Sequence, residues 1–170
     1  MAGTPRKDAA RLKALELLET ANVSSIPVPV ERIAKSQGIV IQYAPLDSEL
    51  SGMAFIKEGV RIIGVNALHH PNRQRFTIAH ELGHHMLHAH LLGSNVHVDT
   101  IVLKRDPASA EGVVLNEIEA NAFAAQLLMP DRWISEIVGP NFDFADDARV
   151  LAVAKRFKVS VSAFQYRMLT

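Results

Sequence analysis

Apolar residues recur every three or four positions over most of the chain, which is the pattern of amphipathic helices. Most strand-like runs of β-branched residues lie before residue 66, where residues 57–60 offer a hairpin turn. A small, mostly antiparallel sheet of about three strands therefore accompanies a helical majority, which predicts an α+β fold. The predicted helices cover residues 5–22, 30–37, 71–88, 112–129, 131–138, 146–157 and 162–169. The predicted strands cover residues 39–43, 52–56 and 61–65, with a further strand at residues 100–103.

Proline and glycine mark the ends of several predicted helices. Pro5 and Pro71 stand where a helix begins, and Pro130 stops the helix that precedes it. Gly38 is a suitable residue just after a helix end. Gly83 lies inside a predicted helix, where glycine costs about 1 kcal/mol relative to alanine. A close approach of a strand or another helix to that face would explain it.

Composition narrows the class of protein. The chain has 170 residues, 48% of them hydrophobic, which fits one domain or a domain with a small appendage. Eighteen basic and 18 acidic residues give a net charge of +0, so we do not expect direct DNA binding. The absence of cysteine excludes a disulfide-stapled domain and a Cys-ligated zinc site. We see no signal peptide and no membrane span, so a soluble cytoplasmic protein is expected, without a membrane partner.

The tail differs from the rest of the chain. We divide the sequence into a core, residues 1–138, and a helical segment, residues 139–170. Two predicted helices joined by a short Val-Ser turn make this segment similar to a helix-turn-helix. The neutral charge favours the alternative, an ordinary helical hairpin that caps the core.

Residues 80–84 read His-Glu-Leu-Gly-His, an HExxH motif, and they carry the strongest chemical signal. His80 and His84 lie one turn apart on one face of the predicted helix, so their imidazoles can share one divalent metal. Glu81 stands beside them, where its carboxylate can take a proton from water activated by that metal. The motif predicts the centre of a zinc peptidase.

A catalytic zinc site needs a third protein ligand and leaves a fourth position open. The helix predicted at residues 112–129 offers Glu117 and Glu119, which point about 160° apart, so only one can reach the metal. We assign the third ligand to Glu119, because Ala122 on its face would allow close packing, and read Glu117 as a solvated neighbour or a residue that supports a ligand. His88 lies about 12 Å from His80 along the helix, so we read it as a supporting or core residue.

Two blocks of sequence resemble the ImmA/IrrE-type metallopeptidases. Residues 73–84 resemble the signature RQRFTxAHELGH, and residues 117–130 resemble the second block, ExEANxFAAxLLMP. Residues 29–34 and 51–53 match the usual lead-in of that family. The similarity is close over roughly residues 26–132 and looser in the tail.

The resemblance implies a zincin-like core of the gluzincin kind, with a small sheet packed on the HExxH helix and on a second ligand helix. By that match His80, His84 and Glu119 hold zinc, with manganese as the alternative ion, and Glu81 is the general base. Three residues are candidate donors to the oxyanion, without a ranking: His97, Arg73 and Tyr166.

The resemblance also implies a target. Family members cleave or otherwise inactivate helix-turn-helix repressors, and some stand in toxin–antitoxin-like operons. The sensor domain and the fused DNA-binding domain of other members have no counterpart between Met1 and Thr170, so we expect a separately encoded repressor or antitoxin. The first alternative is a metal-containing anti-repressor that binds its partner without cutting it. The second is a DNA-binding regulator, for which Lys155, Arg156, Lys158 and Arg167 are sparse.

Overall fold

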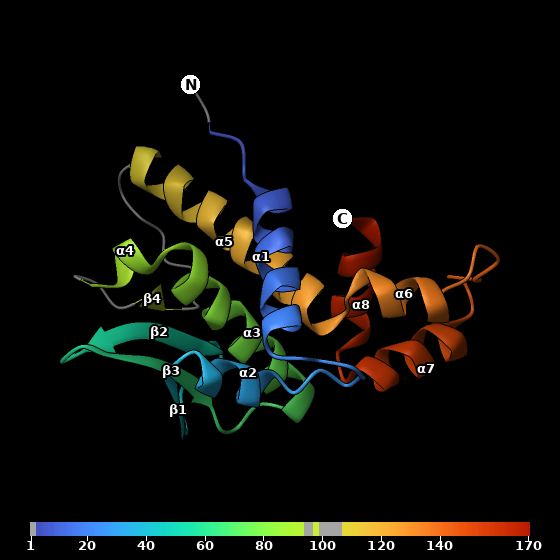
Figure 1. The fold of residues 1–170 in the computed structure, drawn as a ribbon, viewed down its shortest axis with the longest axis horizontal. Helices are drawn as coiled ribbons and strands as arrows, with labels where there is room; N and C mark the ends of the chain where they lie inside the picture. Colours follow the sequence, from blue (N-terminus) through green and yellow to red (C-terminus); the bar gives the residue numbers. More distant parts are fainter. Residues whose placement is uncertain (1–2, 94–96, 99–106) are drawn as a thin grey trace.

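Four strands form one mixed sheet at one end of the molecule (Figure 1). The computed structural model describes residues 3–93, 97–98 and 107–170. The strand order is β1-β3-β2-β4. The strands are β1 (Ile39–Ala44), β2 (Gly52–Lys57), β3 (Val60–Asn66) and β4 (His97–Val98).

The predicted hairpin is confirmed as β2 and β3. Its turn residues, Glu58 and Gly59, have φ angles of 52° and 77°, the paired positive values of a type I′ turn. The short strand β4 also pairs antiparallel with β2. The pairing of β1 with β3 is parallel, so two of the three strand pairings among the described residues are antiparallel, and the sheet is mostly antiparallel, as predicted. The strand predicted at residues 100–103 falls outside the described residues.

Eight helices accompany the sheet within the described ranges, and most lie close to their predicted bounds. Glycine 38, with φ of 74°, follows the end of α2 as expected. The first helix begins at Lys7 rather than at Pro5, because Arg6, at the N-cap position, has non-helical backbone angles. The helices are α1 (Lys7–Thr20), α2 (Val30–Ser36), α3 (Pro71–Leu87), α4 (Ala89–Leu92), α5 (Pro107–Leu128), α6 (Asp131–Ile137), α7 (Asp147–Phe157) and α8 (Val161–Leu169).

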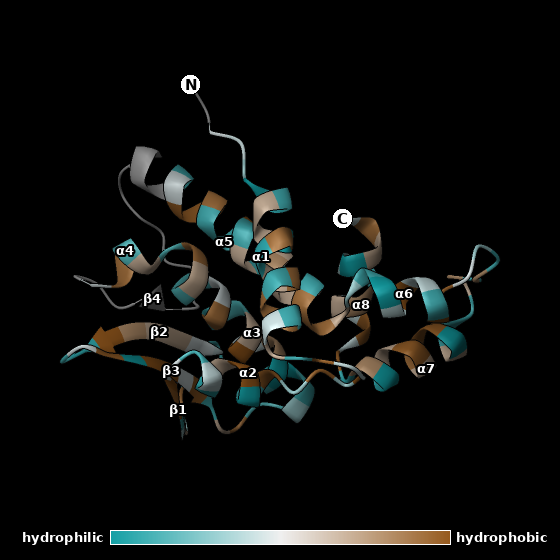
Figure 2. Cartoon of the chain, viewed as in Figure 1, coloured by the Kyte–Doolittle hydropathy of each residue, from teal (hydrophilic) through white to brown (hydrophobic). Residues whose placement is uncertain are grey.

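Helix α3 is the centre of the molecule. It contacts β2 and β3 on one side and α5 on the other, while α1 packs on α5 (Figure 1). The strands are mostly hydrophobic in Figure 2, and α7 alternates between hydrophobic and hydrophilic positions, as an amphipathic helix does. The largest buried side chains include Ile63, Ile78, Leu82, Phe123 and Leu127.

Two glycines allow the close packing of α3. A Cβ atom on Gly52 would lie 2.4 Å from Thr77 Cγ2 and 2.6 Å from the backbone oxygen of Gly64, so β2 could not approach α3 with a larger residue there. A Cβ atom on Gly83 would lie 3.1 Å from Phe123 Cδ1 and 3.3 Å from Ala120 Cα. The expectation that another element approaches Gly83 is confirmed, and that element is α5.

The tail helices pack on the same core as the rest of the chain. Phe157 of α7 and Phe164 of α8 are fully buried in the one hydrophobic cluster. Arg167 of α8 donates to the backbone oxygen of Met129 at 3.1 Å and pairs with Asp131, so it anchors the tail to the junction of α5 and α6. The division at residue 138 and the helix-turn-helix character of the tail stay predictions.

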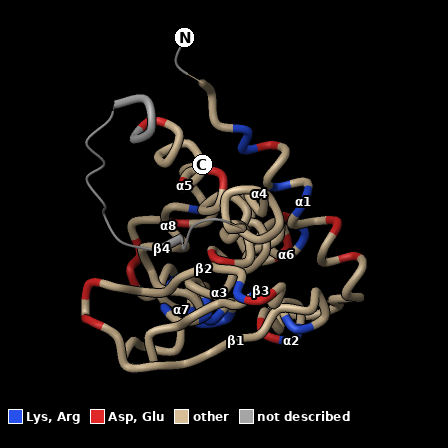
Figure 3. Tube along the Cα trace, turned by 90° about the vertical axis from the view of Figure 1, so that its left-hand side faces the viewer, with Lys and Arg blue, Asp and Glu red and all other residues tan. Residues whose placement is uncertain are grey.

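Acidic and basic residues are interspersed along the chain rather than gathered in separate regions (Figure 3). This distribution agrees with the neutral net charge. Among the described residues, no helix combines the length and the apolar character that crossing a bilayer requires.

Candidate metal centre

His80 and His84 point from α3 toward α5 with their Nε2 atoms 3.1 Å apart. Helix α3 starts at Pro71, and the side chain of His70 accepts a hydrogen bond from the amide of Asn72, which fixes the first turn. The two imidazoles are buried, with exposed fractions of 4% and 1%, and their rings meet edge to face. The one-turn spacing read from the sequence therefore brings both side chains to one point.

Glu117 of α5 completes a group of three ligand atoms. Its Oε2 lies 3.1 Å from Nε2 of His80, and its Oε1 lies 3.2 Å from Nε2 of His84. Ligand atoms at zinc bond lengths and tetrahedral angles stand about 3.3 Å apart, so these separations fit one small ion. Two imidazole nitrogens and one carboxylate also form the donor set of known catalytic zinc sites. The Glu117 side chain is 30% exposed, which leaves the centre open on that side.

The structure does not bring Glu119, the third ligand assigned from the sequence, to this group. Its Oε2 lies 2.9 Å from Nε2 of His88, and its Oε1 accepts from the backbone amide of Arg6 at 2.8 Å. The spacing of the two glutamates allows only one of them to reach the histidine pair. In the structure that residue is Glu117 and not Glu119. The small residue that decides the packing is Ala120, which meets Gly83 and lies one turn after Glu117.

The surroundings of Glu119 favour its ionised form. Burial alone would raise its pKa, but hydrogen bonds from the Arg6 amide, from His88 and from the Arg6 side chain hold the pKa below its usual value. Burial lowers the pKa of His88, against the attraction of Glu119. Both shifts favour a carboxylate that accepts a hydrogen bond from a neutral imidazole.

Asn121 is a supporting residue that the sequence analysis missed. Its Oδ1 lies 2.9 Å from Nδ1 of His80, so the imidazole donates Nδ1–H to the amide oxygen and presents the lone pair of Nε2 toward Glu117, where a metal could bind. Asn121 lies one turn after Glu117 on α5. The spacing of four residues was the signal that could have found it, because such a pair shares one face of a helix.

Glu81, the base predicted from the motif, is fully buried beside the two histidines. It lies on the side of α3 that faces β2, where a Cβ atom on Gly52 would be 3.7 Å from Glu81 Cγ. The neighbouring His85 is also buried, and its Nε2 donates to the backbone oxygen of Ile62 at 2.9 Å. On α3, His80 and His84 therefore face α5, whereas Glu81 and His85 face the sheet. The catalytic role of Glu81 stays a prediction.

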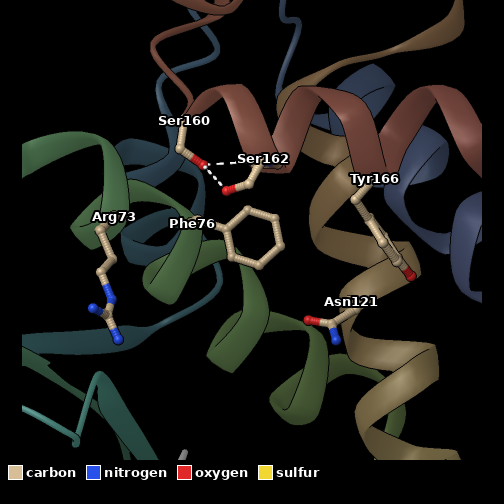
Figure 4. Close-up of a pocket in the computed structure, with 7 residues that line it drawn as sticks. Arg73, Phe76, Asn121, Ser160, Ser162 and Tyr166 are labelled. Carbon is tan, nitrogen blue, oxygen red and sulfur yellow. Dashed lines mark hydrogen bonds between the residues drawn. The ribbon is translucent and has the colours of Figure 1, made fainter.

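A pocket of about 460 Å³ opens between α3, α5 and α8 and shares Asn121 with the histidine group (Figure 4). The ring of Phe76 projects into its centre, with Asn121 and Tyr166 to one side and Arg73 to the other. Its lining comprises Arg73, Phe76, Asn121, Ser160, Ser162, Ala163 and Tyr166.

Two of the three candidate oxyanion donors line this pocket. Burial raises the pKa of Tyr166, so its hydroxyl keeps a proton to donate. Arg73 donates to the Ser51 hydroxyl at 2.9 Å and keeps further N–H groups. The side chain of the third candidate, His97, lies outside the described residues.

Comparison with known proteins gives two matches. The peptidase family described as the IrrE N-terminal-like domain matches residues 34–169. A protein of Deinococcus radiodurans named radiation response metalloprotease IrrE is 37% identical over 108 residues, which are 63% of this chain. The match covers 30% of that protein's length. His80, His84, Glu117 and Asn121 all lie inside the range matched by the family.

Proposed function

Because the chain belongs to the peptidase family described as the IrrE N-terminal-like domain, we propose that it is a metal-dependent endopeptidase. The observation that carries the proposal is the convergence of His80 Nε2, His84 Nε2 and the Glu117 carboxylate. The name of the Deinococcus protein, a metalloprotease, supports the same activity. Two nitrogens and one oxygen at these separations favour zinc, and manganese is the alternative ion.

Each residue of the centre has a distinct task in peptide hydrolysis. His80, His84 and Glu117 would hold a divalent ion, which would supply the Lewis acidity that makes water easier to deprotonate and the scissile carbonyl easier to attack. Glu81 accepts the proton of the attacking water on its carboxylate and returns it to the leaving amine. Tyr166, with its protonated hydroxyl, is the donor we propose for the developing oxyanion.

We propose a separately encoded helix-turn-helix repressor or antitoxin as the substrate, which would place the activity in the cytoplasm. The resemblance of the two sequence blocks to repressor-inactivating peptidases supports this choice. The pocket beside Asn121 has room for one large side chain of a peptide, so we expect it to select the residue next to the cleaved bond.

The test uses the purified full chain, loaded with zinc or with manganese and incubated with the repressor encoded nearest to its gene. We expect one discrete cut, identified by mass spectrometry of the fragments. Glu81→Gln should bind the metal as the original protein does and lose about 10²–10⁴-fold in cleavage rate, because only the proton acceptor is removed.

Glu136→Gln is the matched control, since Glu136 is exposed on α6 away from the centre, and it should cleave normally. Full cleavage by Glu81→Gln would contradict the mechanism. A stable complex with the repressor, without any fragment under either metal, would favour the anti-repressor instead.

A further inference from the structure

A chain of hydrogen bonds leads from His84 to the N-terminal segment. Nδ1 of His84 lies 3.1 Å from Nδ1 of His88, and Nε2 of His88 lies 2.9 Å from the Glu119 carboxylate. The other oxygen of Glu119 accepts from the backbone amide of Arg6 at 2.8 Å and from its Nε at 3.4 Å. Arg6 precedes residues 34–169, so the last link lies outside the range that the family matches.

The order of donors and acceptors along these bonds indicates one placement of the protons. The Glu119 carboxylate accepts from the Arg6 amide through Oε1, and its Oε2 accepts a hydrogen bond from Nε2–H of His88. With its proton on Nε2, the His88 ring presents Nδ1 as an acceptor, and among the described residues the donor facing it is Nδ1–H of His84 at 3.1 Å. In this tautomer Nε2 of His84 carries a lone pair rather than a proton, and it lies 3.1 Å from Nε2 of His80 and 3.2 Å from Oε1 of Glu117.

The burial of the chain supports a defined geometry. His84 and His88 are each 1% exposed, and Glu119 is 5% exposed, so water does not compete for these bonds. The Arg6 side chain is 71% exposed, but its amide nitrogen makes the shorter bond to Glu119. The backbone of the N-terminal segment, more than its charged side chain, therefore orients the carboxylate.

We propose that His88, Glu119 and Arg6 form a positioning relay that holds His84 in the tautomer able to bind metal. The proposal rests on the metal centre of the proposed function. It makes the N-terminal segment part of that centre. Outer partners of this kind change metal affinity by about 10–100-fold.

The first experiment measures zinc affinity by competition with a chromophoric chelator and, separately, the melting temperature of the metal-free protein. His88→Ala and Glu119→Ala should each weaken zinc binding about 10–100-fold. Glu119→Gln keeps an oxygen that accepts from His88, so we expect it to recover most of the affinity. A purely structural role would lower the melting temperature of these variants and leave zinc affinity unchanged.

His85→Ala is the matched control, because His85 is equally buried on α3 but bonds to the sheet rather than to a ligand. It should lower the melting temperature and keep zinc affinity. An equal loss of affinity in His85→Ala would overturn the relay, because a general loosening of α3 would then explain the result.

A pair of substitutions isolates the backbone link. Arg6→Ala removes the guanidinium and keeps the amide, whereas Arg6→Pro removes the amide hydrogen as well, at a φ of −86° that is close to the proline range. We expect zinc affinity to fall more in Arg6→Pro than in Arg6→Ala. Equal affinities would remove Arg6 from the relay.

Imidazole ¹H–¹⁵N spectra of the unaltered protein test the tautomers directly. We expect His84 and His80 to carry the proton on Nδ1 and His88 to carry it on Nε2. The opposite tautomer of His88 would overturn the relay even with the metal centre intact. If the unaltered protein fails to bind zinc, the proposed function fails together with the relay, whereas the opposite tautomer of His88 in a protein that binds zinc overturns the relay alone.

Discussion

His80 and His84 stand one turn apart on the same helix, yet the two imidazoles are held in different ways. The half-buried Asn121 supports His80, beside a pocket that opens to solvent. The buried His88 and Glu119 support His84, on a side that the pocket does not reach. One half of the centre is therefore accessible to a substrate, and the other half is fixed inside the protein.

Helix α5 serves both halves from different faces. Glu117 and Asn121, four residues apart, face the accessible half, while Glu119 faces the buried one. Two glutamates of one sequence motif therefore have different proposed roles. Glu117 is a metal ligand, and Glu119 holds His88 in place.

The largest effect should come from comparing the two glutamates. Glu117→Gln should weaken zinc binding by more than the roughly 100-fold limit of an outer partner, because it removes a proposed ligand. Glu119→Gln should stay well inside that limit. Chelator competition measures both, and a reversed order would return the third ligand to Glu119.

Removing the support of each histidine should affect the stability of the metal-free protein unequally. His88→Ala leaves a cavity and deprives the buried Glu119 of a partner, so we expect a loss of about 3 kcal/mol in unfolding free energy. Asn121→Ala should cost about 1 kcal/mol, because water can reach the half-buried site. Urea denaturation compares them, and equal losses would mean that the two halves are equally rigid.

Filling the pocket should affect the accessible half alone. Ser162 is exposed on the rim, so Ser162→Trp should lower kcat/KM about tenfold or more while zinc affinity stays unchanged. Gln165→Trp, exposed on the same helix but outside the lining, is the matched control and should cleave normally. Normal kcat/KM in Ser162→Trp would show that the substrate does not use this pocket.

Acid should weaken the buried half first. The pKa of His88 is lowered from 6.5, so the unfolded chain takes up its proton before the folded protein does. Stability from this residue is therefore present above pH 6.5 and is lost as the pH falls toward the folded pKa. The pKa of Glu119 is also lowered, so the stability that this residue contributes is lost as the pH falls below about 4.5.

The pH dependence of urea midpoints should show this in the metal-free protein. His88→Ala should reduce the slope of unfolding free energy against pH by at most about 1.4 kcal/mol per pH unit. Asn121→Ala should leave this slope unchanged. Parallel slopes for all three proteins would contradict the assignment.

The sequence by itself determined the parts that depend on local spacing and local backbone chemistry. The one-turn spacing of His80 and His84 fixed their common face, and Glu58-Gly59 fixed the hairpin turn. Pro71 and Gly38 marked helix ends correctly, because proline and glycine restrict or free the backbone at the residue itself. The distance of His88 from His80 along the helix also predicted that His88 stands apart from the histidine pair, and its Nε2 faces Glu119 instead.

Only the tertiary structure decided which glutamate meets the histidines and what holds them. The rotation of α5 is set by the contact of Ala120 with Gly83, and Ala122 offered an equally small residue on the competing face. The bond from Arg6 to Glu119 joins residues 113 positions apart, a separation at which no local pattern constrains the partners. The sequence identified the histidines and glutamates that could bind a metal. It did not identify which of them meet, because the distances between ligand atoms on different helices depend on how those helices pack.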